Sequence, residues 1–176
     1  DQPFTWASGW NSPIYCDNRK TLSYPHIRDY IKDCFAQQIL ATYGKPDIIA
    51  GVATGGIALG ALVAQELDLP FCYVRSQAKA HGLNNTIEGD YKPGQTVVVI
   101  EDLISSGKSS LNAVRDLKAA HLKVIGMGAI FSYGFKIADE NFKAAECQLF
   151  TLTNYPTLIK EALKTNYINN EAIASL

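Results

Sequence analysis

Residues 97–110 have the sequence VVVIEDLISSGKSS, which combines an apolar strand-like run, two adjacent acids and a turn of small residues. The triplet Gly107-Lys108-Ser109 matches the end of the phosphate loop of nucleoside triphosphatases. That loop also needs a glycine five positions before its Gly-Lys pair. Asp102 stands at this position, and its carboxylate would repel the phosphate that a glycine there would cradle. The sequence therefore excludes a triphosphatase loop.

The turn from Ser105 to Ser110 still has the composition of a phosphate site, because it opens a predicted helix. Helix N-termini bind phosphate through unpaired backbone N–H groups and the positive end of the helix dipole. Glu101 and Asp102 precede the turn, where they could face the hydroxyl groups of a sugar or a magnesium ion. This combination indicates a sugar phosphate as the ligand.

Apolar runs that alternate with helical patterns predict an α/β fold, with a central, mainly parallel sheet flanked by helices in one domain of residues 1–176. The predicted strands cover residues 47–52, 70–74, 97–101, 123–131 and 147–152, and the main predicted helices cover 24–42, 54–68 and 106–120, with one more between the last two strands and one after Pro156. The buried face of the first helix is expected to carry Ile27, Ile31, Phe35 and Ile39. Residues 76–92 show no period, which is typical of a binding loop or lid.

Ligands of open α/β sheets bind beyond the carboxyl ends of the strands. We expect four segments to meet there: residues 53–56, Arg75 with its loop, residues 101–109 and residues 132–134. Two of these segments are small-residue turns that precede helices, so the ligand is expected to carry two anionic groups. A phosphorylated sugar with a pyrophosphate would fit.

The composition excludes several classes of function. The chain has 176 residues, of which 47% are hydrophobic and 19% charged, and its net charge is −1 without a basic block. Neither nucleic acid nor a membrane surface is therefore an expected partner. The 4 cysteines lie far apart without a CxxC pair, which argues against zinc and fits reduced thiols in the cytoplasm. No apolar run approaches the ~20 residues that span a bilayer.

The stretch VVVIEDLISSGKSS resembles the phosphoribosyl-pyrophosphate signature of type I phosphoribosyltransferases, and two further stretches are similar to orotate phosphoribosyltransferases in particular. FTWASGWNSPIYCDNR, residues 4–19, resembles the base-binding segment of that family, and RSQAKAHG, residues 75–82, resembles its catalytic loop. The resemblance implies the type I phosphoribosyltransferase fold, with a small N-terminal hood segment at residues 1–22 and a mobile catalytic loop at residues 76–92. The family's first helix would precede Asp1.

The resemblance also implies an activity, which is the transfer of ribose 5-phosphate from phosphoribosyl pyrophosphate to orotate. The products would be orotidine 5′-monophosphate and pyrophosphate, in pyrimidine synthesis. Magnesium is the implied cofactor, held mainly through the substrate near Glu101 and Asp102 and not by protein side chains alone. The implied assembly is a cytoplasmic homodimer in which the loop of one subunit acts in the site of the other.

Carried over by position, the resemblance assigns catalysis to Lys79, His81 and Asp102. Phosphoribosyl pyrophosphate would contact Arg75, Lys79, His81, Glu101, Asp102, Leu103, Ile104, Ser105, Ser106, Gly107, Lys108 and Ser109. Glu101 and Asp102 would contact the ribose hydroxyls, and residues 105–109 would bind the 5′-phosphate. Arg75, Lys79 and His81 would bind the pyrophosphate. The side chain of Lys108 is expected to point into solvent.

Orotate would contact Ser105, Arg19 and Tyr15. Some family members have a lysine where this chain has Ala7, which leaves the orotate carboxylate without an evident cation. Arg19 is the candidate replacement, although it could instead pair with Asp17 or cap a helix.

Two alternatives remain open from the sequence. A purine phosphoribosyltransferase would share the sugar site but needs a different base pocket, and residues 4–19 argue against it. A regulatory protein that senses phosphoribosyl pyrophosphate would usually carry a basic DNA-binding segment, and none is visible in this sequence.

Overall fold

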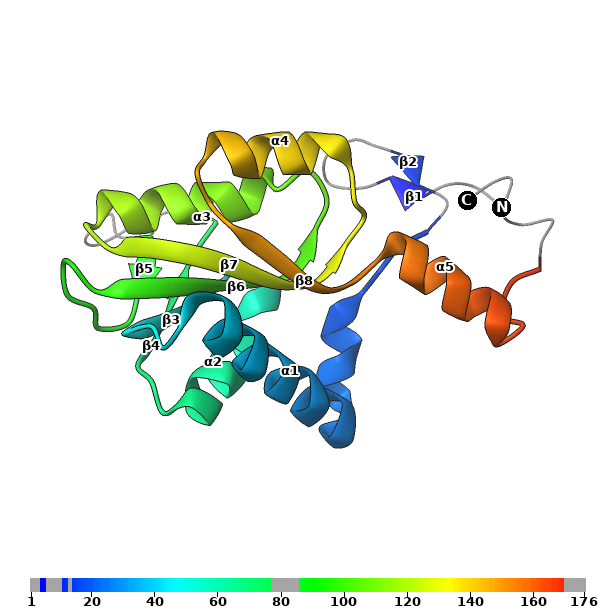
Figure 1. The fold of residues 1–176 in the computed structure, drawn as a ribbon, viewed down its shortest axis with the longest axis horizontal. Coiled ribbons are helices and arrows are strands. Elements are labelled where there is room, and N and C mark those ends of the chain that lie inside the picture. The colour runs from blue at the N-terminus through cyan, green and yellow to red at the C-terminus, as the bar shows by residue number, and fades with distance from the viewer. Residues whose placement is uncertain (1–3, 6–10, 13, 77–85, 170–176) are drawn as a thin grey trace. The chain divides into compact units, whose positions relative to one another are not determined.

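The computed structural model describes residues 4–5, 11–12, 14–76 and 86–169 (Figure 1). The chain divides into two compact units, one of residues 18–154 and one that combines residues up to 17 with residues from 155 onward. That both units act as one domain, as expected from the sequence, stays a prediction.

The larger unit contains a six-stranded sheet with the strand order β5-β4-β3-β6-β7-β8. In chain order its strands are β3 (Ile48–Val52), β4 (Phe71–Val74), β5 (Ile87–Glu88), β6 (Thr96–Ile104), β7 (Lys123–Ser132) and β8 (Leu149–Asn154). Neighbouring strands pair in parallel except β4 and β5, which are antiparallel. This arrangement confirms the α/β fold with a mainly parallel sheet.

Helices cover both faces of this sheet. They are the 3₁₀ helix η1 (Asn18–Ser23) and the α-helices α1 (Pro25–Tyr43), α2 (Gly55–Leu67), α3 (Lys108–Ala119) and α4 (Lys136–Ala144). Figure 1 shows α1 and α2 on one face of the sheet and α3 and α4 on the other. The sheet is therefore the middle layer of three.

The central strand β6 supplies side chains to the cores on both faces. Val97 and Val99 pack in the cluster that contains the buried side chains of α3 and α4, whereas Val98 and Ile100 pack in the cluster of α1 and α2. Successive residues of a strand face opposite sides of the sheet. A strand that is covered on both faces therefore needs a continuous apolar run, which is what the sequence shows.

Helix α1 (Pro25–Tyr43) begins and ends within one residue of the predicted bounds, 24–42. Pro25 occupies its first turn, where the missing N–H needs no partner, and Gly44 follows its last turn with a φ of +75°. Phe35 and Ile39 are fully buried, but Ile27 is 36% exposed, contrary to the predicted buried face. All buried residues of α1 lie in the second half of the helix. The apolar residues in its first half therefore follow the helical spacing without being buried.

The segment 76–92 contains a strand that the sequence does not predict. Ile87 and Glu88 form β5, which pairs with Val74 and Tyr73 of β4. Two residues are too few to show the alternation by which a strand is recognised. The segment is therefore structured at least from residue 86 onward, while residues 77–85 lie outside the described part of the chain.

The smaller unit contains a pair of two-residue strands, β1 (Phe4–Thr5) and β2 (Asn11–Ser12), which are antiparallel, and the helix α5 (Tyr155–Lys164). The ring of Phe4 lies 6.0 Å from that of Tyr15, centroid to centroid. None of the helices in the described residues has the length and apolar character that a bilayer crossing requires.

Candidate active site

Four of the parallel strands end at the same edge of the sheet, because β4, β3, β6 and β7 are consecutive neighbours that run in one direction. The segments that follow these strands are residues 53–56, Arg75, residues 105–107 and residues 133–135. The topology thus brings together the four segments that the sequence places at the ligand edge. Glu101 and Asp102 lie within β6 itself, which continues to Ile104 and not only to Glu101 as predicted.

The loop between β6 and α3 presents a series of backbone donors. In the part of the chain that the structure describes, the N–H groups of residues 105–109 donate no hydrogen bond. Helix α3 begins at Lys108, so these groups lie at or just before a helix N-terminus. Unpaired donors together with the positive end of a helix dipole suit a phosphate.

The carbonyl groups around this loop are, in contrast, engaged. The Ile104 carbonyl accepts the Tyr133 N–H at 3.1 Å, and the Gly107 carbonyl accepts the Leu111 N–H at 2.9 Å. The Ser106 carbonyl accepts the side-chain amide of Asn141 at 2.9 Å. The loop is therefore held in place by hydrogen bonds to carbonyl groups, while its N–H groups remain available to a ligand.

Glu101 is buried directly beneath the loop, with 6% of its surface exposed. Its Oε1 accepts the Asp102 N–H at 2.9 Å and its Oε2 accepts the Ser110 hydroxyl at 3.0 Å, which links β6 to α3. Burial, followed by the proximity of the Asp102 carboxyl group, raises the pKa of Glu101 well above its usual value. Its contact with ribose hydroxyls stays a prediction, since both of its oxygens accept bonds from the chain in this structure.

Asp102 is half-buried and packs against the start of α2. A Cβ at Gly55 would lie 2.3 Å from the Asp102 carboxylate, so only a glycine leaves room for this approach. The Asp102 carbonyl accepts the side-chain amide of Asn18 at 2.8 Å. A narrow cleft here is lined by Asp102, Gly55, Arg19 and Arg28, among others. The structure thus brings Arg19, a predicted orotate ligand, near the second acid of the signature.

Arg75 follows β4 and forms an ion pair across the sheet edge. Its Nη1 lies 3.4 Å from Oε1 of Glu88 in β5, and about a third of each side chain is exposed (32% and 28%). The predicted contact of Arg75 with pyrophosphate is compatible with this position, because surface ion pairs of this kind are weak and exchangeable. Glu88 was not identified from the sequence.

The structure shows different amounts about the remaining predicted site residues. Lys79 and His81 are outside the described residues. Tyr15 belongs to the smaller unit, where it is 56% exposed. Ser105 is half-buried within the loop, and Lys108 is exposed as expected.

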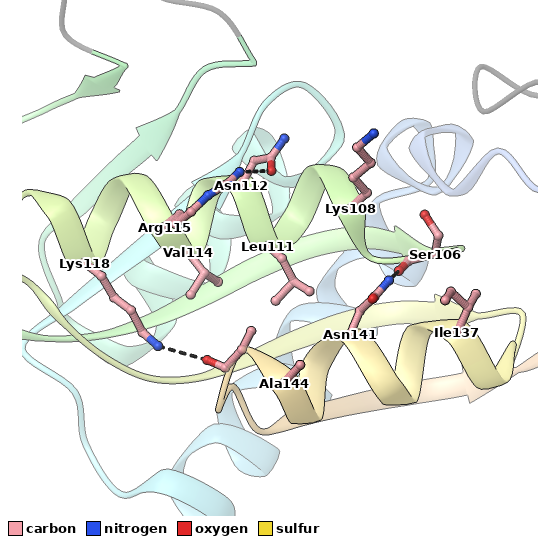
Figure 2. A pocket seen from close by; sticks show the side chains of 11 residues that line it. Ser106, Lys108, Leu111, Asn112, Val114, Arg115, Lys118, Ile137, Asn141 and Ala144 are labelled. Carbon is pink, nitrogen blue, oxygen red and sulfur yellow. Dashed lines mark hydrogen bonds between the residues drawn. The ribbon is translucent and has the colours of Figure 1, made fainter.

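Behind the loop, a groove of about 620 Å³ runs between α3 and α4 (Figure 2). The groove is lined by Ser106 of the loop and by three cations of α3. Its apolar lining comes from both helices. The cations are Lys108, Arg115 and Lys118, and the apolar residues include Leu111, Val114 and Ile137. Lys118 donates across the groove to the Ala145 carbonyl at 3.0 Å. Figure 2 shows the Asn141 amide pointing from α4 toward Ser106, which connects this groove to the loop.

The side chains available for a metal are few. Within the described residues, no group of three or more His, Cys, Asp and Glu side chains could hold an ion by itself. Magnesium prefers oxygen ligands and usually keeps water or substrate phosphate among them. Asp102, at the ligand edge, fits the role of a single carboxylate that shares magnesium with a phosphorylated substrate, whereas Glu101 is already bonded on both oxygens.

Comparison with known proteins agrees with this geometry. The family model described as a phosphoribosyl transferase domain matches residues 20–158. The chain is 59% identical over 174 residues to the orotate phosphoribosyltransferase of Phocaeicola vulgatus, an alignment that covers 99% of this chain and 82% of that protein. The chain belongs to the orotate phosphoribosyltransferase family.

Solved structures extend the comparison to more distant relatives. The crystal structure of orotate phosphoribosyltransferase from Aeropyrum pernix is similar with a TM-score of 0.80 at 27% identity, covering 95% of this chain and 92% of that one. An adenine phosphoribosyltransferase from Leishmania donovani has a TM-score of 0.67 at 21% identity, covering 82% of this chain and 72% of that one. The second likeness concerns the fold alone, so membership of the orotate family rests on the closer sequences.

Four residues around the site were missed by sequence reasoning: Asn18, Glu88, Ser110 and Asn141. Asn18 lies inside the SPIYCDNR stretch that was assigned to the base, and Ser110 ends the signature itself. Their proximity to these motifs is a signal that could have identified them. Asn141 lies in an amphipathic helix far from any motif, and nothing in its sequence neighbourhood marks it.

Proposed function

We propose that the chain transfers ribose 5-phosphate from phosphoribosyl pyrophosphate to orotate. The proposal is carried by one observation: within the described residues the N–H groups of residues 105–109, at the N-terminus of α3 and separated from the acid pair by two residues, donate no hydrogen bond. A 5′-phosphate held there places its ribose near Asp102, at the edge where the other strands end. Membership of the orotate phosphoribosyltransferase family supports orotate as the base.

In the proposed reaction, the bond between C1 of ribose and the pyrophosphate oxygen breaks, and a bond forms between C1 and N1 of orotate. N1 releases its proton to solvent, and pyrophosphate leaves from the opposite face of the sugar. Positive charge develops on the ribose, so the Asp102 carboxylate would stabilise it while accepting hydrogen bonds from the ribose hydroxyls. Magnesium, when bound beside Asp102, would neutralise charge on the pyrophosphate.

The pyrophosphate would lie against the turn at residues 53–56, where α2 begins, with Arg75 beside it. Binding would draw Arg75 away from Glu88, since a bidentate guanidinium–phosphate pair is stronger than their 3.4 Å ion pair. Lys79 and His81 would add charge from the loop and help to exclude water, which would otherwise hydrolyse the sugar. Arg19, in the cleft beside Asp102, would bind the orotate carboxylate.

The decisive experiment follows the ultraviolet absorbance of orotate with phosphoribosyl pyrophosphate and magnesium. Uracil, adenine and hypoxanthine serve as control bases. We expect turnover of orotate alone. Turnover of adenine or hypoxanthine without orotate would make this chain a purine enzyme, and binding of phosphoribosyl pyrophosphate without turnover of any base would favour a regulatory protein.

We also propose a cytoplasmic homodimer in which Lys79 and His81 act in the partner's site. The proposal can be tested by mixing the inactive variants Lys79→Ala and Asp102→Asn under conditions of subunit exchange. A mixed dimer would contain one site with an intact loop and an intact acid, so activity should return to about a quarter of wild type if exchange is random. If exchange is demonstrated and no activity returns, the loop acts within its own subunit.

A further inference from the structure

The peptide between Ser106 and Gly107 precedes the only glycine among residues 105–110 of the phosphate loop. Gly107 has a φ of +76°, and glycine occupies positive and negative φ about equally well. The two orientations of this peptide plane therefore differ little in intrinsic energy. An external contact is needed to select one of them.

That contact is the side-chain amide of Asn141, which donates to the Ser106 carbonyl at 2.9 Å. The C=O and N–H of a trans peptide are parallel to one plane and point in opposite directions. With the Ser106 carbonyl held toward α4, the N–H of Gly107 must point away from α4. Rotation of the same peptide would place a carbonyl oxygen where the phosphate needs a donor.

Helix α4 is well placed to hold Asn141 in this position. The neighbouring Phe142 is 4% exposed, and a Cβ at Gly107 would lie 2.6 Å from its ring, so the helix contacts the loop closely. The hydrogen bond from Lys118 to the Ala145 carbonyl fastens the end of α4 to α3. Asn141 is itself half-buried between the two helices, as Figure 2 shows.

We propose that Asn141 is a positioning residue for the phosphoribosyl site, which orients the Gly107 N–H toward the 5′-phosphate from the opposite side of the loop. Asn141 does not touch the substrate in this arrangement. Its effect is carried by the Ser106–Gly107 peptide. The inference rests on the proposed use of residues 105–109 as a phosphate site.

The substitution Asn141→Asp tests this role most sharply. Aspartate has nearly the same shape, but its ionised carboxylate only accepts hydrogen bonds, so it repels the Ser106 carbonyl and favours the rotated peptide. We expect the KM for phosphoribosyl pyrophosphate to rise about tenfold or more, which corresponds to the loss of one well-formed hydrogen bond to an anion. The KM for orotate should change less than about twofold, because one loop donor does not contact the base.

The matched control is Asn112→Asp. Asn112 lines the same groove from α3 and accepts a hydrogen bond from Arg115, and among the described residues its side chain has no hydrogen bond to the loop. This variant introduces the same charge into the same groove and should leave both KM values near those of wild type. If both variants raise the KM for phosphoribosyl pyrophosphate equally, the effect is one of groove charge and the inference is overturned.

A second measurement does not depend on turnover. Binding of ribose 5-phosphate can be measured by calorimetry, and the Gly107 amide can be followed by ¹⁵N NMR. We expect ribose 5-phosphate to shift the Gly107 amide resonance in wild type and Asn112→Asp, and to bind Asn141→Asp at least about tenfold more weakly. Equal affinities of the three proteins overturn the inference. If Asn141→Asp does not fold, Asn141→Ala, which removes the donor without adding charge, replaces it in both experiments.

Failure of the proposed function gives a different result. A wild-type protein that binds ribose 5-phosphate through Gly107 but does not consume orotate would contradict the proposed reaction and leave the role of Asn141 supported. Absence of ribose 5-phosphate binding in wild type would overturn both the proposed function and the role of Asn141.

Discussion

Two helix N-termini at the edge of the sheet are built in different ways. The loop before α3 is held by hydrogen bonds, which Tyr133 donates to the Ile104 carbonyl at the end of β6 and Asn141 donates to the Ser106 carbonyl. The turn before α2 is instead pressed against β6, since a Cβ at Gly56 would lie 2.3 Å from the Ile100 carbonyl oxygen and one at Gly55 equally close to Asp102. Both helix N-termini can bind an anion. The one at α3 is positioned by hydrogen bonds, whereas the one at α2 is positioned by close packing against β6.

This difference predicts which substitutions each site tolerates. Backbone atoms of a central strand cannot move aside for an added side chain, so replacing a glycine that packs against them at the start of α2 by alanine should lower the stability of the fold. Hydrogen bonds to a loop can be lost with less damage to the core, so changes near α3 should affect ligand binding more than stability. The predictions below are ordered by the size of the expected effect.

Gly56→Ala should have the largest effect. Its Cβ would meet the Ile100 carbonyl oxygen, which belongs to the central strand and cannot move away. We expect a loss of about 3 kcal/mol or more in the free energy of unfolding, measured with urea, against the ~1 kcal/mol that alanine normally gains over glycine in a helix. Ala58→Gly, at an exposed position of α2, is the control for helix propensity and should cost about 1 kcal/mol. A stable Gly56→Ala protein would show that the turn is not fixed by packing.

Gly55→Ala should instead reduce activity with less effect on stability. The nearest atoms to its Cβ belong to the carboxylate of Asp102, the end of a side chain that can rotate away. Displacement of this carboxylate from the ribose hydroxyls should lower kcat/KM by about tenfold or more, the typical value of a hydrogen bond to a charged group. Steady-state kinetics of the folded variant test this, with Asp102→Asn for comparison. Wild-type kinetics in Gly55→Ala would contradict the proposed role of Asp102.

Glu101→Gln should change how stability depends on pH. Folding raises the pKa of Glu101 well above its usual 4.5. This group therefore contributes its full stability below the usual pKa, and the contribution is lost as the pH rises toward the raised pKa of the folded state. Glutamine has no charge to lose, can still accept the Asp102 N–H and can donate to Ser110.

The measurement compares urea unfolding of wild type and Glu101→Gln over a pH series that begins below 4.5. Wild type should lose stability relative to the variant as the pH rises. Glu140→Gln, at an exposed position of α4, is the matched control and should follow wild type. Parallel curves for wild type and Glu101→Gln would show that the buried carboxyl does not titrate as its surroundings indicate.

The sequence predicts those parts of the site that depend on local pattern. The apolar runs of β3 and β6 specify the sheet, and the small residues and acids of 97–110 specify the phosphate loop. The hydrogen bonds of Asn18 and Asn141 could not be predicted, even though Asn18 lies in a motif, because each joins a side chain to a main-chain carbonyl that is 84 or 35 residues away. Every residue has a carbonyl, so no side-chain pattern marks such a pair. The strand β5 was missed because two residues show no period.

The smallest effect on stability and activity is expected for the ion pair of Arg75 with Glu88, beside the start of α2. Arg75 and Glu88 form a partly exposed pair at 3.4 Å, so Glu88→Gln should change the free energy of unfolding by less than about 1 kcal/mol. If Arg75 binds pyrophosphate, loss of Glu88 releases it for the substrate, and the KM for phosphoribosyl pyrophosphate should fall by about twofold, whereas Arg75→Ala should raise it. The double variant isolates the coupling, because Glu88→Gln should have no effect on this KM once Arg75 is absent. A similar decrease in the Arg75→Ala background would mean that Glu88 acts on the substrate by general charge repulsion and not through Arg75.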